Sequence, residues 1–149
     1  MTELSELSLG PQVLVRGAPP AGFPVEPNTT APARGREVLW LGPDEWLVLG
    51  GTESDYPDAD AAVDVSANRV GFALAGEDAA DVLAQTCALD LDAIPDGCCA
   101  QTLVAGVQAI LVRDGKETWR ILVRPSFAAY VRAWLEDALA GATSRRSSR

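Results

Sequence analysis

The chain has 149 residues, of which 48% are hydrophobic, and its 21 acidic and 12 basic residues set a formal net charge of −9 at neutral pH. This length predicts one domain with a core of useful size. The acidic balance disfavours nucleic-acid binding, which needs a basic face, and no apolar run reaches the roughly 18 residues of a membrane span.

Histidine is absent from the sequence, so it lacks the commonest metal ligand and the commonest general base. The three cysteines, Cys87, Cys98 and Cys99, form no metal-binding or redox spacing. Their odd number and an acidic N-terminus without a basic leader region predict reduced thiols and a cytoplasmic protein. Ser66 follows Asp64 closely but has no base to activate it. We therefore predict no catalytic, cofactor-binding or metal-binding residue in this chain.

Residues 1–37 are predicted to form an N-terminal arm and a proline-rich loop. Residues 1–10 are polar and expected to be mobile, and Val13–Val15 is expected to form a short edge strand. Gly17–Gly35 holds five of the ten prolines, and proline fixes φ and lacks a donor, which disfavours sheet and helix. The segment is either a surface loop or an arm that lies across a partner, and both interpretations stay open.

An α+β domain is predicted over residues 38–141. It begins with two short apolar strands, Val38–Leu41 and Trp46–Leu49, joined by the turn Gly42-Pro43-Asp44-Glu45. Its central stretch reads as a strand at Val63–Val65, a turn, and a strand with Val70, Phe72 and Leu74 at period two. A helix follows Gly76, and its apolar stripe is expected to pack on the preceding strand. That stripe consists of Ala79, Val82, Leu83 and Thr86.

The remaining strands are expected at Thr102–Val104, Val107–Val112 and Trp119–Val123, with Gly106 as a bulge or bend. Asp114-Gly115 predicts a two-residue type I′ hairpin with positive φ at both residues. Ser126 is the expected N-cap of a final helix with Gly141 at its C-terminal cap. Its predicted apolar stripe contains Phe127, Val131, Trp134, Leu135, Ala138 and Leu139. Residues 142–149 are predicted to be a disordered basic tail. The fold class is α+β with mostly antiparallel sheet and two main helices.

Four residues are the candidates for a partner interface: Asp44, Glu45, Trp46 and Arg69. Asp44 and Glu45 present charge on a turn that Pro43 stiffens, and arginine pairs with carboxylates in a bidentate way. Tryptophan is enriched at interface hot spots. For Trp46 we favour the core for the indole body and the interface for the charged turn beside it.

Four segments in this order resemble the gamma subunit of heterotetrameric sarcosine oxidase. They are GPDEWLVL (Gly42–Leu49), the stretch Val63–Leu91, GCCAQT (Gly97–Thr102) and RPSFAAYVRAWLEDAL (Arg124–Leu139). Ala88 and Gln101 depart from the family pattern, which has proline and often arginine at these positions.

The resemblance implies a fold like the folate-binding module of T-protein-like aminomethyltransferases. It also implies a non-catalytic structural subunit of a complex that oxidatively demethylates sarcosine to glycine. That complex produces hydrogen peroxide, together with formaldehyde or methylenetetrahydrofolate. FAD, FMN, NAD and tetrahydrofolate are then cofactors of the complex and none belongs to this chain. The implied partners are the alpha, beta and delta subunits, mainly alpha, with no nucleic acid and no membrane.

Two alternatives come from other classes. A stand-alone folate-binding protein of the same superfamily would carry a Lys-Gly-Cys-Tyr-x-Gly-Gln-Glu signature, of which Gly97-Cys98 and Gln101 are only an echo. A folate-dependent aminomethyltransferase would carry an Asp-Asp motif, and this sequence has no such pair.

Overall fold

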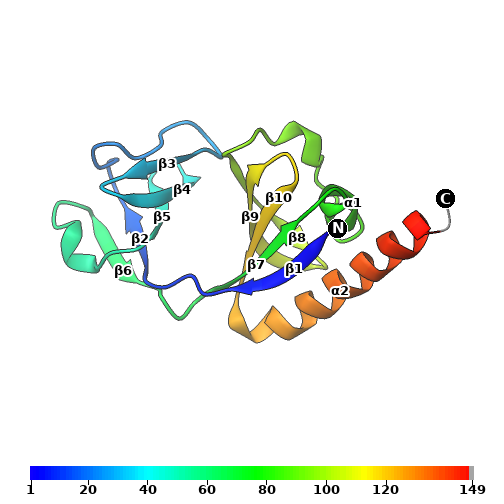
Figure 1. Cartoon of the computed structure of the whole chain (residues 1–149). Helices are drawn as coiled ribbons and strands as arrows, with labels where there is room; N and C mark the ends of the chain where they lie inside the picture. Colours follow the sequence, from blue (N-terminus) through cyan, green and yellow to red (C-terminus); the bar gives the residue numbers. More distant parts are fainter. Residues whose placement is uncertain (148–149) are drawn as a thin grey trace.

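The computed structural model describes residues 1–147 and places them in two five-stranded sheets and two α-helices (Figure 1). Sheet A has the order β1-β7-β10-β9-β8 and sheet B the order β3-β4-β5-β2-β6. All neighbouring strands are antiparallel, so the predicted α+β class is confirmed. The strands of sheet A are β1 (Glu3–Leu7), β7 (Val70–Ala75), β8 (Cys99–Val104), β9 (Val107–Gly115) and β10 (Thr118–Val123). Those of sheet B are β2 (Gln12–Arg16), β3 (Thr30–Ala33), β4 (Arg36–Gly42), β5 (Glu45–Leu49) and β6 (Ala61–Asp64).

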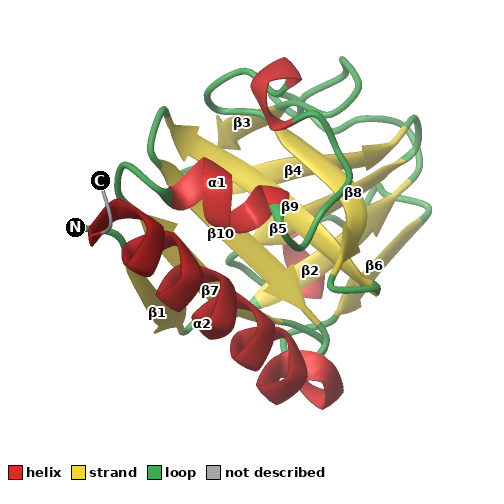
Figure 2. Cartoon of the chain, turned by 90° about the vertical axis from the view of Figure 1, so that its right-hand side faces the viewer, coloured by secondary structure: helices red, strands yellow, loops and turns green. Residues whose placement is uncertain are grey.

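Sheet A forms the middle layer. The helices α1 (Ala79–Ala84) and α2 (Pro125–Ser147) lie over one of its faces (Figure 2). The cluster between helices and sheet includes Phe72, Leu83, Trp119 and Leu135. The opposite face of sheet A packs on sheet B through a cluster that contains Leu39, Leu47, Ile110 and Leu122. Burial of these side chains on both faces of sheet A is the main source of stability of the fold.

The central stretch forms the predicted strand, turn, strand and helix, but its two strands lie in different sheets. β6 belongs to sheet B and β7 to sheet A, so residues 65–69 cross from one sheet to the other. The connection between β1 and β2 crosses in the same way. The helix after Gly76 packs on β7 as predicted, with Ala79, Val82 and Leu83 fully buried. This double crossing places Arg69 at the junction of the two sheets.

Within residues 1–37 the strand expected at Val13–Val15 is present, but the other expectations of secondary structure are wrong. Residues 3–7 form β1, which pairs with β7, and β2 lies between β5 and β6, so it is no edge strand. Pro32 lies in β3, an edge strand of sheet B, where a missing N–H costs no ladder hydrogen bond. The proline-rich segment folds back on its own sheet. Its Phe23 is buried, and the carbonyl of Pro24 accepts a hydrogen bond from Trp46.

Helix α2 is longer than predicted. It begins at Pro125, one residue before Ser126, and Pro125 suits the first helical position because its missing N–H would be unpaired there anyway. It continues through Gly141 to Ser147, so the predicted cap and the start of the predicted disordered tail are wrong. Ala142 continues the buried stripe of Val131, Leu135 and Ala138, which explains the extension. Residues 148–149 lie outside the described residues. None of the described helices is long and apolar enough to span a membrane.

The predicted type I′ turn at Asp114-Gly115 is wrong, because neither residue has a positive φ. Strand β9 continues to Gly115, and the register shifts between Thr118 and Trp119 so that Asp114 is an extra residue on β9. Such a bulge redirects a side chain. A two-residue turn with positive φ at both positions occurs instead at Ala105-Gly106, where φ is 53° and 81°. The expected bend at Gly106 is therefore a hairpin turn.

We predict that Ala105→Gly raises the free energy of unfolding by about 0.5–1 kcal/mol, because an alanine in the left-handed region is strained. The Ala105 backbone is held in place by hydrogen bonds from its N–H to the carbonyl of Thr86 and from the Tyr130 hydroxyl to its own carbonyl. Urea denaturation measures the change. Gly106→Ala is the matched control and should lower stability by about 1–2 kcal/mol. A loss of stability in Ala105→Gly would contradict this account of the turn.

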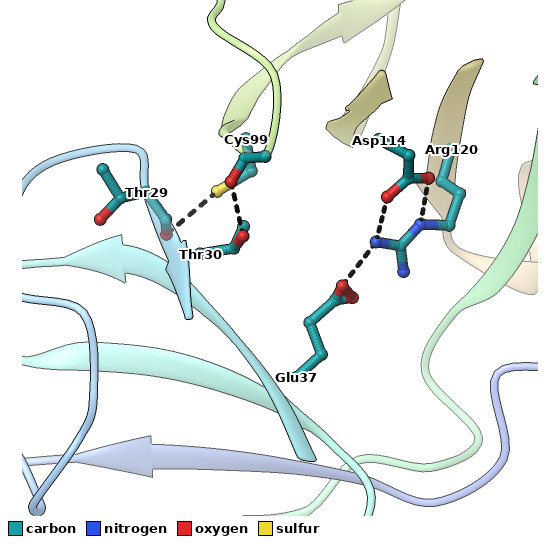
Figure 3. A network of polar contacts seen from close by, with 7 residues as sticks. Thr29, Thr30, Glu37, Cys99, Asp114 and Arg120 are labelled. Carbon is teal, nitrogen blue, oxygen red and sulfur yellow. Dashed lines mark hydrogen bonds and ion pairs between the residues drawn. The ribbon is translucent and has the colours of Figure 1, made fainter. Parts of the chain in front are cut away.

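A polar network connects the two sheets (Figure 3). Arg120 on β10 contacts Asp114 through two hydrogen bonds of 2.7 and 2.8 Å and Glu37 on β4 through one of 2.6 Å. Burial opposes the charged guanidinium, but these hydrogen bonds outweigh burial and raise the pKa of Arg120. The bulge that redirects Asp114 thus completes a bidentate ion pair.

Candidate functional site

The Cys99 thiol occupies a structural position. Cys99 is buried between the sheets, its sulfur lies 3.7 Å from the carbonyl of Thr29 (Figure 3), and burial raises its pKa to about 12. A thiol with that pKa holds almost no nucleophilic thiolate at neutral pH. Within residues 1–147, no group of three or more Cys, Asp or Glu side chains is arranged to hold a metal ion.

Ser66 and Asp64 build the crossing between the sheets. The Ser66 hydroxyl donates to the Asp64 carboxylate at 2.5 Å and accepts from the backbone N–H of Gln12 at 3.0 Å. Hydrogen bonds from the Ser66 side chain and backbone lower the pKa of Asp64. The fully buried Gln12 side chain then donates to the carbonyls of Ser66 and Arg69. These bonds fix the backbone that carries Arg69.

The turn between β4 and β5 lies where it was predicted, at Pro43-Asp44. Asp44 is exposed, and its carbonyl accepts a hydrogen bond of 3.0 Å from Gly17. The Glu45 carboxylate is half-buried and lies 3.3 Å from Nη2 of Arg16. This pair is largely solvated, so it contributes little to stability. The two carboxylates are therefore available as surface charge.

Trp46 points away from that surface. Its side chain is fully buried, its indole N–H donates to the carbonyl of Pro24 at 2.8 Å, and its ring meets Phe23 edge to face at 5.7 Å. The favoured interpretation, a core position for the indole body, is correct. Of the four candidates, the structure leaves Asp44, Glu45 and Arg69 within reach of a partner.

Arg69 lines a cavity of about 330 Å³ at the junction of the sheets. Strands β8, β9 and β10 form its floor through Gln101, Leu103, Ile110 and Leu122, and Arg124 completes the wall. Burial lowers the pKa of Arg69, the charge of Arg124 lowers it further, and the nearby Glu45 opposes this shift. The structure thus brings Arg69 and Glu45 together, whereas Trp46 lies in a separate cluster.

Sequence reasoning missed Arg124 and a group of exposed aromatic residues. Phe127, Tyr130 and Trp134 were assigned to a buried stripe or left out, yet they are 44%, 48% and 47% exposed on one flank of α2. Their spacing of three and four residues was a signal for a common face, and it lies beside the buried stripe. Large exposed apolar groups that cluster in this way are typical of interaction surfaces.

Gln101, which departs from the family pattern, closes the gap between the sheets. Its side-chain amide donates to the carbonyl of Leu41 at 2.7 Å, and this bond ties β8 to β4 beside the cavity. The substituted residue therefore has a clear structural role.

Comparison with known proteins gives consistent matches. A model of the sarcosine oxidase gamma subunit family matches residues 21–141. The chain is 32% identical over 163 residues to sarcosine oxidase subunit gamma of Corynebacterium sp. (strain P-1), with 92% of this chain and 79% of that protein covered. It is 37% identical over 118 residues to the subunit from strain U-96, covering 70% and 57%. A solved heterotetrameric sarcosine oxidase from Corynebacterium sp. U-96 contains a similar chain, with a TM-score of 0.81, 28% identity, and coverage of 94% and 84%.

Proposed function

The chain belongs to the sarcosine oxidase gamma subunit family, and we propose that it is the non-catalytic gamma subunit of a heterotetrameric sarcosine oxidase. The observation that carries the proposal is the similarity of nearly the whole fold to a chain of such a complex. In this role the chain docks on the alpha subunit, within an assembly that also contains beta and delta subunits. FAD, FMN, NAD and tetrahydrofolate are held by those partners.

The chemistry of the chain supports a docking role. The sequence has no histidine, and the buried Cys99 thiol is kept protonated. In contrast, the surface carries the charged turn at Asp44 and Glu45 and the exposed aromatic flank of α2. Aromatic side chains are enriched at protein interfaces, and charged groups at an interface orient the partner.

Co-expression with the alpha, beta and delta subunits tests the proposal. The chain should co-purify with them, and the chain purified without them should be colourless and should not oxidise sarcosine. The alternative, a stand-alone folate-binding protein, predicts micromolar tetrahydrofolate binding by the chain alone in calorimetry and no co-purification. A flavin bound stoichiometrically to the isolated chain would overturn the proposal.

We predict that Asp44→Ala combined with Glu45→Ala reduces co-purification with the alpha subunit about tenfold and leaves the melting temperature almost unchanged. Both carboxylates are solvent-accessible, and the one ion pair that is lost, between Glu45 and Arg16, is exposed. The control is Asp58→Ala with Asp60→Ala, which removes the same charge from another exposed loop. Full assembly of the turn variant at physiological salt would exclude this turn from the interface.

A further inference from the structure

Arg69 and Arg124 line one cavity and lack the ion pairs that five other arginines of the described residues form. Ion pairs within the described residues are formed by Arg16, Arg36, Arg113, Arg120 and Arg132. Neither Arg69 nor Arg124 forms an ion pair or a side-chain hydrogen bond with a described residue. Both line the same cavity, Arg69 half-buried and Arg124 exposed.

The two guanidinium groups repel each other. Burial lowers the pKa of Arg69 and the positive charge of Arg124 adds to this, with Glu45 as a partial counterweight. Glu45 is shared, because it also pairs with Arg16. A half-buried cation of this kind gains most from an anion that comes from outside the chain and accepts hydrogen bonds from both arginines.

The surroundings of the two arginines narrow the choice of anion. Strand β10 leads from the cavity into α2, whose first turn contains no acidic residue to offset the positive end of the helix. Leu103, which is 53% exposed, presents an apolar side chain to the same cavity, beside the amide side chains of Gln101 and Gln108. A carboxylate with an apolar neighbour in its own chain matches this combination of cationic, amide and apolar lining.

We propose that the Arg69–Arg124 cavity receives an aspartate or glutamate side chain of another subunit of the complex. The inference rests on the proposed function, because the carboxylate comes from a partner subunit. The cavity would be a second contact region with the partner, in addition to the charged turn at Asp44 and Glu45. At the cavity the positive charge comes from this chain, although the chain is acidic as a whole. The opposite signs at the two regions orient the partner, since a rotated partner would meet like charges.

Carbodiimide cross-linking of the assembled complex tests the proposal directly. The reagent joins an amine to a carboxylate in contact with it, so Arg124→Lys provides an amine at the cavity and keeps the positive charge. Mass spectrometry should find an amide between position 124 and an aspartate or glutamate of another subunit. Arg132→Lys is the matched control, because Arg132 contacts Glu6 and Glu136 and should give cross-links within the chain only.

Competitive assembly supplies the quantitative arm. Differently tagged wild-type and Arg69→Gln/Arg124→Gln chains are co-expressed with the other subunits, and the variant should be incorporated about 30-fold less. Arg132→Gln, which removes an exposed charge, should be incorporated within about threefold of wild type. The Arg69→Lys/Arg124→Lys chain should recover much of the loss, which separates the missing charge from misfolding.

The outcomes separate this inference from the proposed function. If the wild-type chain does not assemble with the other subunits, both are overturned. If it assembles but the amine at position 124 links only to this chain or to nothing, the inference is overturned and the proposed function stands. Equal incorporation of the double glutamine variant would likewise show that the cavity takes no partner carboxylate.

Discussion

Replacing Trp46 with alanine should lower the free energy of unfolding by about 3–5 kcal/mol. The side chain is fully buried on the outer face of sheet B, in a cluster with Phe23, Val48 and Tyr56. Truncation leaves a cavity in this cluster and removes the edge-to-face contact with Phe23. It also leaves the carbonyl of Pro24 without the indole N–H that donates to it at 2.8 Å.

Urea denaturation of the chain measures this effect, and Trp134→Ala is the matched control. The Trp134 side chain is 47% exposed on α2, so its removal should cost about 1 kcal/mol or less. The same two variants also test assembly. Trp134→Ala should weaken it more than Trp46→Ala does, because Trp134 lies on a surface within reach of a partner and Trp46 does not. A loss below about 1 kcal/mol for Trp46→Ala would show that the indole is no core anchor.

The sequence predicted the elements whose signals are local. The turn at Pro43-Asp44, the alternation of Phe72 and Leu74, and the buried stripe of α1 were all correct. In each case a few neighbouring residues decide the structure, through a fixed φ, a period of two or a period of 3.6. The same holds for the α+β class, which depends only on the types of element.

Pairing between strands that are distant in the sequence could not be predicted from such local patterns. Strand β1 was expected to be mobile because its sequence ELSEL is polar, and it is ordered by pairing with β7. The turn at Ala105 requires a left-handed alanine, which no propensity favours, and it is held by bonds to Thr86 and Tyr130. At Asp114-Gly115 the sequence strongly favours a two-residue turn. The pairing of β9 with β10 instead continues through these residues and includes a bulge.

The candidate site was predicted in part for the same reason. Arg69 was identified from its place beside a turn, but Arg124 reaches the same cavity only because β10 ends beside the crossing between the sheets. The exposed flank of α2 was missed because the spacing of apolar residues does not reveal how much of the helix surface packs against the sheet. Phe127 and Trp134 lie just outside that packed surface.

Replacing Arg120 with alanine should lower the free energy of unfolding by about 2–4 kcal/mol. Its guanidinium is 17% exposed and contacts Glu37 at 2.6 Å and Asp114 at 2.7 Å. The substitution removes one of the polar contacts between sheets A and B and leaves the Glu37 and Asp114 carboxylates without the cation they share. A charge left without its partner in a partly buried place costs more than the pair itself contributes.

A second variant separates the charge of Arg120 from its packing. Arg120→Met keeps an apolar stem and should lose nearly as much stability as Arg120→Ala, because the two carboxylates lose their cation in both variants. Arg132→Ala is the control, because its ion pairs with Glu6 and Glu136 are about half exposed and should contribute at most about 1 kcal/mol. Recovery of most of the stability in Arg120→Met would indicate that the side chain stabilises the fold through packing and not through its charge.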